Sequence, residues 1–143
     1  MLTGRRWSTS IDCHNVGWTY HAEGNFEEAL RRFEQALEVR LQFSAVEPIR
    51  IARWCIARCR RSLGQVAEAL AGQVQLLAEF EASGQTSGYV WEELGECHLA
   101  LGDAATARPY FALAHAELSQ GAWLVAHEPQ RLLRLRELGE GGA

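Results

Sequence analysis

Three glycines divide this sequence at nearly equal intervals and constrain its fold more than any other feature. Gly24, Gly64 and Gly102 are 40 and 38 residues apart, and each stands between two segments with apolar residues at helical spacing. Glycine ends helices readily because it has no Cβ to oppose a left-handed backbone. The regular spacing therefore predicts a repeat of helical hairpins, with one glycine at each turn.

Residues beside these glycines carry helix-start signals. Asn25 and Asp103 can accept hydrogen bonds from the first free amides of a helix, and Glu28 can complete a capping box with Asn25. Pro48 and Pro129 suit the first turn of a helix. The predicted helices span residues 8–23, 26–43, 48–63, 66–82, 88–101, 104–119 and 129–138. Since the loops between them are short, sequential helices are expected to pack antiparallel.

Composition excludes several classes of protein. The chain has 143 residues, 48 % of them apolar and 22 % charged, which is typical of one globular domain. All fourteen basic residues are arginine, so chemistry that needs a lysine nucleophile or a phosphate-loop lysine is ruled out. The net charge of −4 argues against a nucleic-acid partner.

The units aligned on these glycines share a pattern of small and large residues. The third unit has the pattern W-x2-L-G at Trp91, Leu94 and Gly95. The second departs from the pattern, with Arg60 in place of tyrosine and Gln73 in place of an aromatic residue. The positions that match between units are Gly17, Tyr20, Ala29, Phe33 and Ala36, then Ala57 and Ala69, then Ala100, Ala107, Phe111 and Ala114. With this pattern the chain resembles the tetratricopeptide repeat (TPR) family.

This resemblance implies an all-α fold: a right-handed stack of three antiparallel TPR-like hairpins with a C-terminal capping helix. The expected units cover about 10–47, 48–87 and 88–119, followed by a cap at 120–138 and a frayed tail at 139–143. In the cap, Trp123 and Leu124 are expected to dock on the last hairpin.

In the TPR family the first helix of each unit lines a concave groove that binds peptides. Helical periodicity selects the residues expected to face that groove. They form an aromatic and histidine row, a tryptophan and arginine row, and an acidic row: His14, Trp18 and His21; Trp54, Arg58 and Arg61; Tyr89, Glu92 and Glu96. Aromatic side chains bury area at low entropic cost, and arginine binds carboxylates through its planar fork.

Two structural alternatives compete with this groove. The tryptophans could pack between neighbouring helices or lie under the capping helix, and Arg58 could pair with Glu92 or Glu96. The lysines that hold a terminal carboxylate in some TPR modules are absent from this chain, so that ligand is not expected.

Catalytic and metal sites are not indicated. Cys13, Cys55, Cys59 and Cys97 lie inside helical patterns without zinc-site spacing, which predicts small buried thiols. His14 and His21 are two helical turns apart, too far to share one ion. No nucleophile motif or phosphate loop is present, so we expect no cofactor, no metal and no enzymatic activity.

The leading hypothesis is a non-catalytic module, an adaptor or scaffold, that binds a protein or peptide partner in the groove. The alternatives are a regulatory sensor that binds a short peptide or small ligand there, and an enzyme or enzyme subunit. Neither an apolar leader nor a membrane span is evident, which predicts a protein of a bacterial-type cytoplasm that does not bind a membrane. No nucleic-acid partner is expected. We expect the chain to be a monomer or a weak homodimer.

Overall fold

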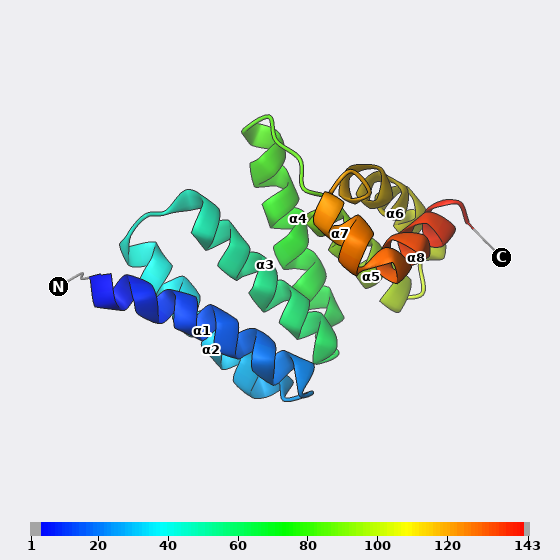
Figure 1. The fold of residues 1–143 in the computed structure, drawn as a ribbon. Helices are drawn as coiled ribbons and strands as arrows, with labels where there is room; N and C mark the ends of the chain where they lie inside the picture. Colours follow the sequence, from blue (N-terminus) through cyan, green and yellow to red (C-terminus); the bar gives the residue numbers. More distant parts are fainter. Residues whose placement is uncertain (1–3, 142–143) are drawn as a thin grey trace. The chain divides into compact units, whose positions relative to one another are not determined.

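The computed structural model describes residues 4–141, which form eight α-helices joined by short turns (Figure 1). The helices are α1 (Gly4–Ala22), α2 (Phe26–Gln42), α3 (Val46–Ser62), α4 (Val66–Ala82), α5 (Gly88–Ala100), α6 (Ala104–Leu118), α7 (Ala122–His127) and α8 (Pro129–Gly139). This confirms the all-α prediction and the seven predicted helices to within a few residues at their ends. It adds α7, which was predicted as an apolar segment rather than a helix.

The chain divides into two compact units, the first ending at Gly72 and the second beginning at Gln73. The boundary lies inside α4. In the first unit, α2 packs against both α1 and α3. In the second, α5 and α6 form a hairpin, and α8 packs on α6. The predicted repeat boundaries remain a prediction, and residues 142 and 143 of the predicted tail lie outside the described residues.

The turns between hairpin helices follow from the glycines. Gly24, Gly64 and Gly102 have φ values of +81°, +82° and +83°, a left-handed conformation that side chains with a Cβ rarely adopt. Directly after two of these turns, the side chains of Asn25 and Asp103 accept the backbone amides three residues on. The same glycine turn and polar cap thus recur in both units.

The predicted capping box at Glu28 is wrong. The Asn25 amide donates instead to the carbonyl of Tyr20, at 2.9 Å. The Glu28 carboxylate lies 3.0 Å from Arg31 and 3.4 Å from Arg32 on the same helix. The turn itself satisfies the amide that the box would have taken, which leaves Glu28 to ion pairs on the helix surface.

A glycine packed on a phenylalanine joins the two helices of the α1–α2 hairpin and those of the α5–α6 hairpin. A Cβ at Gly17 of α1 would lie 2.6 Å from Phe33 Cε1 of α2, and one at Gly95 of α5 would lie 2.8 Å from Phe111 Cε1 of α6. Both phenylalanines are almost fully buried. The corresponding position in α4 is Gln73, which is also fully buried, with no hydrogen-bond partner for its amide among the described residues.

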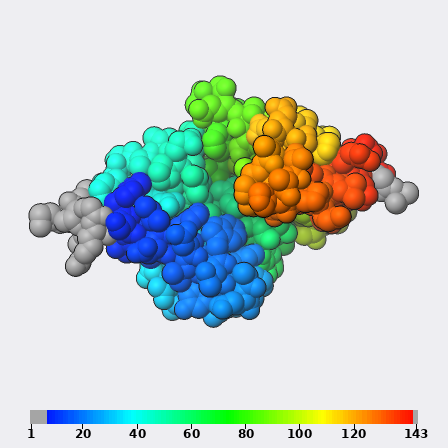
Figure 2. All heavy atoms as spheres, viewed as in Figure 1, coloured from blue at the N-terminus to red at the C-terminus, as the bar shows by residue number. Residues whose placement is uncertain are grey.

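The core of the second unit includes the end of the chain. Leu124 of α7 and Leu132 and Leu135 of α8 are buried with Phe111 of α6. Leu124 therefore docks as predicted, but Trp123 does not, since it is 62 % exposed and its ring stacks on His127 at 4.7 Å. Neighbouring residues on a helix point about 100° apart, so only one of the two can face the core. Figure 2 shows this segment, in orange, at the surface.

Adding a methyl group at either glycine is expected to destabilise the hairpin that contains it. Gly17→Ala and Gly95→Ala should each lower the free energy of unfolding by about 1–3 kcal/mol, because an overpacked phenylalanine outweighs the gain in helix propensity. The matched control is Gly72→Ala, whose added Cβ would lie 3.3 Å from the Ala57 Cβ and requires only a small shift. Urea denaturation measures all three, and equal stability of the three variants would contradict the close-packing account.

Candidate functional site

Two tryptophans lie side by side on neighbouring helices of the first unit. The rings of Trp18 of α1 and Trp54 of α3 have centroids 6.1 Å apart. Trp18 also packs on Phe33 at 5.0 Å. Both tryptophans are partly buried and keep an exposed part. The predicted first and second rows are therefore adjacent, and their tryptophans both support the core and contribute to the surface.

A hydrogen-bonded chain links the polar residues of the same two helices. His21 Nε2 lies 2.8 Å from Ser62 Oγ, and Arg58 Nη1 donates to the same oxygen at 2.7 Å. Farther along, His14 Nδ1 lies 3.9 Å from the Cys55 thiol. Two histidines of α1 thus contact polar side chains of α3, and Arg61 lies on the last turn of α3.

Burial shifts the pKa of both histidines downward. Desolvation is the larger cause for each, and the Arg40 charge adds to it at His14. At His21 the charges of Arg58 and Arg61 add to it. Both rings are therefore held in the neutral state more strongly than a solvent-exposed histidine.

Arg40 is a structural residue that the analysis of the sequence did not identify. Its side chain is buried in the first unit, where Nη1 donates to the Pro48 carbonyl at 3.0 Å and Nε donates to Ser10 Oγ at 3.5 Å. It thereby connects α2 with α1 and with the first turn of α3. Its spacing from Phe33 and Ala36 places it on the buried stripe of α2. This spacing is the feature of the sequence that could have predicted its burial.

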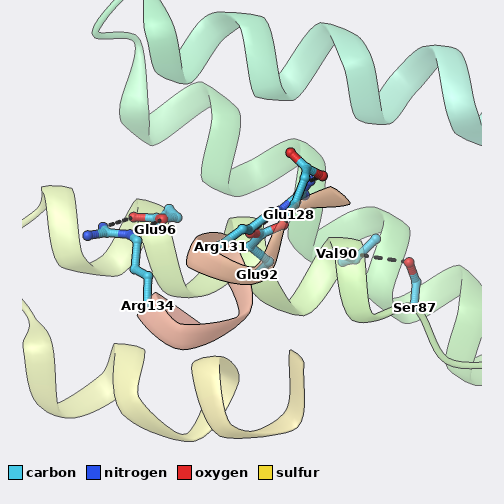
Figure 3. Close-up of polar contacts among 7 residues, drawn as sticks. All are labelled: Ser87, Val90, Glu92, Glu96, Glu128, Arg131 and Arg134. Carbon is cyan, nitrogen blue, oxygen red and sulfur yellow. Dashed lines mark hydrogen bonds and ion pairs between the residues drawn. The ribbon is translucent and has the colours of Figure 1, made fainter. Parts of the chain in front are cut away.

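The two carboxylates of the acidic row on α5 pair with arginines of α8 (Figure 3). Glu92, which is 6 % exposed, accepts hydrogen bonds from Arg131 Nε at 2.8 Å and Arg131 Nη2 at 2.5 Å. Glu96 accepts from Arg134 Nε at 3.2 Å and Nη2 at 2.8 Å. The Arg131 guanidinium also lies 5.5 Å from the centre of the Tyr89 ring. All three residues predicted for the acidic row therefore contact or pair with α8.

Comparison with known proteins identifies the repeat. A family model described as tetratricopeptide repeat matches residues 13–47. This range covers the second half of α1, all of α2, the loop between them and the first residues of α3. The chain carries a tetratricopeptide repeat.

The fold of a TPR domain extends well beyond that repeat. The crystal structure of the TPR domain of FLU from Arabidopsis is similar, with a TM-score of 0.71 and 19 % sequence identity. The match covers 81 % of this chain and 99 % of the FLU domain. No curated protein matches the chain in sequence. The resemblance to the TPR family is thereby confirmed, and TPR domains are in general protein interaction modules.

All four cysteines are buried, and none of them forms a disulfide bond within residues 4–141. Burial raises the pKa of Cys55 to about 12 and that of Cys59 to about 11. Such thiols carry little thiolate at neutral pH and are poor nucleophiles and poor metal ligands. Within residues 4–141, no three histidine, cysteine or carboxylate side chains gather closely enough to hold a metal ion. No helix in that range has the length and apolar character needed to cross a membrane.

The histidines predict how stability depends on pH. Because the folded-state pKa values of His14 and His21 are lowered, the unfolded chain binds protons more readily as the pH falls through about 6.5. The two histidines therefore stabilise the fold above this pH, and the protein should lose stability as the pH falls from 7.5 towards 5.

Urea denaturation at several pH values measures this effect. In the His14→Gln/His21→Gln variant, the loss of stability over the same pH range should be smaller than in the wild type. His127→Gln is a control, since this ring stacks on the exposed Trp123 in the other unit. An unchanged pH dependence in the double variant would contradict the lowered pKa values.

Proposed function

We propose that this chain is a non-catalytic interaction module that binds an acidic segment of a protein partner on the α1–α3 face of its first unit. We define this face by His14, Trp18, His21, Trp54, Arg58 and Arg61. The observation that carries the proposal is the pair of neighbouring tryptophans, 6.1 Å apart, beside arginines of α3. Aromatic residues and arginine are the residue types that contribute most to binding at protein interfaces.

The charge of α3 supports an acidic partner. This helix contains five arginines and one acidic residue, Glu47, which lies in its first turn. The predicted face residues of α1 and α3 include no carboxylate. A segment that offers carboxylates for the arginines and an apolar side chain for the tryptophans would complement both features.

The residues Tyr89, Glu92 and Glu96, first expected to complete the groove, are left out of this proposed surface. The carboxylates of Glu92 and Glu96 are paired with arginines of α8, the Tyr89 ring lies beside Arg131, and a partner on the α1–α3 face does not need these residues. We further propose that the protein works in the cytoplasm as a monomer or weak homodimer. Its four buried cysteines, none of which forms a disulfide bond within residues 4–141, are consistent with a reducing compartment.

A peptide selection tests the proposed function. A displayed library of random peptides is selected on the immobilised wild-type protein, and the affinities of the enriched peptides are measured by fluorescence anisotropy. We expect enriched peptides to combine acidic residues with an aromatic or large aliphatic residue. Their affinity should fall as salt is raised, because salt screens the charges.

Charge reversal then locates the binding surface. Arg58→Glu/Arg61→Glu should weaken the selected peptides at least tenfold, about 1.4 kcal/mol or more. The matched control is Arg31→Glu/Arg136→Glu, which changes the net charge equally at side chains that are 67 % and 58 % exposed. Trp54→Phe separates the role of the tryptophan from folding, since it keeps a large aromatic ring. Equal affinity in the reversed variant and its control would reject the α1–α3 face as the binding surface.

A further inference from the structure

The C-terminal helix α8 is basic, whereas the rest of the second unit is acidic. Residues 73–127 contain seven acidic residues and a single arginine, Arg108. Three arginines and one acidic residue follow in α8. The second unit therefore obtains most of its positive charge from α8. Two of the seven acidic residues in 73–127, Glu92 and Glu96, pair with that helix.

Two arginines of α8, three residues apart, are each held by a carboxylate of α5. Arg131 forms two hydrogen bonds with Glu92 and a third, at 3.0 Å, with Glu128 at the start of α8. Arg134 forms two hydrogen bonds with Glu96. Paired hydrogen bonds of this kind fix the direction of a guanidinium as well as its position (Figure 3). Spacing and direction together make α5 selective for arginine at these two positions.

Leucines of α8 fill the apolar part of the surface that α8 covers on α5 and α6, which we call the α5–α6 seat. Leu132 and Leu135 each directly follow one of these arginines and are buried against the α5–α6 hairpin, with Leu135 fully covered. The backbones of α8 and α6 also approach closely, since a Cβ at Gly139 would lie 2.8 Å from the Ala112 nitrogen. The residues of α8 that make these contacts form the pattern R-L-x-R-L.

The connection between α8 and the rest of the unit is short and weakly anchored. Helix α7 has six residues, of which Leu124 alone is buried. Gly121, which precedes α7, has no side chain to cap that helix, and the Glu128 side chain makes no capping hydrogen bond to α8. Most of the described contacts that hold α8 are therefore those of its own arginines and leucines, which another helix with the same pattern could provide.

We propose that the α5–α6 seat is a second binding site, specific for an amphipathic helix of a protein partner that carries R-L-x-R-L, and that α8 is the intramolecular occupant which this helix displaces. The site would bind a basic helix, whereas the α1–α3 face would bind an acidic segment. The two sites lie on different helices and share no residue, so either can fail in experiment without the other.

A labelled peptide tests the seat directly. The probe is a synthetic peptide of residues 122–140 with a fluorophore at its amino end, and its binding to full-length protein is followed by anisotropy. In Arg131→Glu/Arg134→Glu protein, α8 is repelled by α5 and the seat becomes available. This variant should bind the probe at least tenfold more tightly than wild type, because in wild type only the small open fraction binds.

Two controls separate recognition from general charge effects. Arg31→Glu/Arg136→Glu alters net charge equally without touching the α5 pairs, and it should bind the probe like wild type. Adding Glu92→Gln/Glu96→Gln to the α8 variant should abolish the gain, because the carboxylates that hold the arginines are gone. If the α8 variant is folded by circular dichroism and binds the probe no more tightly than wild type, the proposal is overturned.

A milder variant covers the case in which the double reversal fails to fold. Arg134 is 53 % exposed, so Arg134→Gln should preserve the fold while raising probe affinity at least threefold. No gain in that variant would overturn the proposal. Sedimentation of wild-type protein at the assay concentration should show a monomer. A dimer that is lost in Glu92→Gln/Glu96→Gln would also overturn it, by making the α8 of a second copy the occupant.

Discussion

The contact between a helical glycine and a phenylalanine on the next helix is the constraint on which the α1–α2 and α5–α6 hairpins depend. At Gly17 and Gly95 the missing Cβ leaves room for the ring of Phe33 or Phe111, so the two helices approach closely. The left-handed glycine at the turn then brings the chain back along the first helix. The faces opposite this contact become available for other side chains, and each proposed binding surface includes one helix positioned in this way, α1 or α5.

The two units use their first helices differently. In the first unit, α1 and α3 combine aromatic rings with arginines, and the charge of α3 is strongly positive. In the second unit, α5 offers carboxylates, and α8 covers them with arginines. Arginines thus contribute to both arrangements: Arg58 and Arg61 of α3 contribute to a surface that we propose binds a partner, and Arg131 and Arg134 of α8 pair with α5.

Much of the fold could be predicted from the sequence because the determining signals are local. Glycine spacing, polar caps and apolar periodicity located seven helices, and the small and aromatic positions revealed the repeat. The outcome at Glu28 could not be predicted in the same way, since its partner depends on whether the Asn25 amide is already satisfied by the turn. Likewise, predicting that Leu124 is buried and Trp123 exposed requires the exact rotation of α7 about its axis.

The candidate site was predicted less completely because pairs between distant residues leave no local signal. Helical periodicity placed Trp18 and Trp54 in adjacent rows, as found. It could not show that Glu92 and Glu96 would meet Arg131 and Arg134, which lie 39 and 38 residues away in sequence. The arginines of the cap appeared only as the solvated side of an amphipathic helix.

The central claim, that a partner binds on the α1–α3 face, is tested most directly by the indole N–H signals of the five tryptophans. A nitrogen-15 NMR titration with a selected acidic peptide observes each indole separately once the signals are assigned by single substitutions. We expect the signals of Trp18 and Trp54 to shift with peptide concentration, while that of Trp91 in the second unit stays in place. A shift of Trp91 with Trp18 and Trp54 unchanged would contradict the claim.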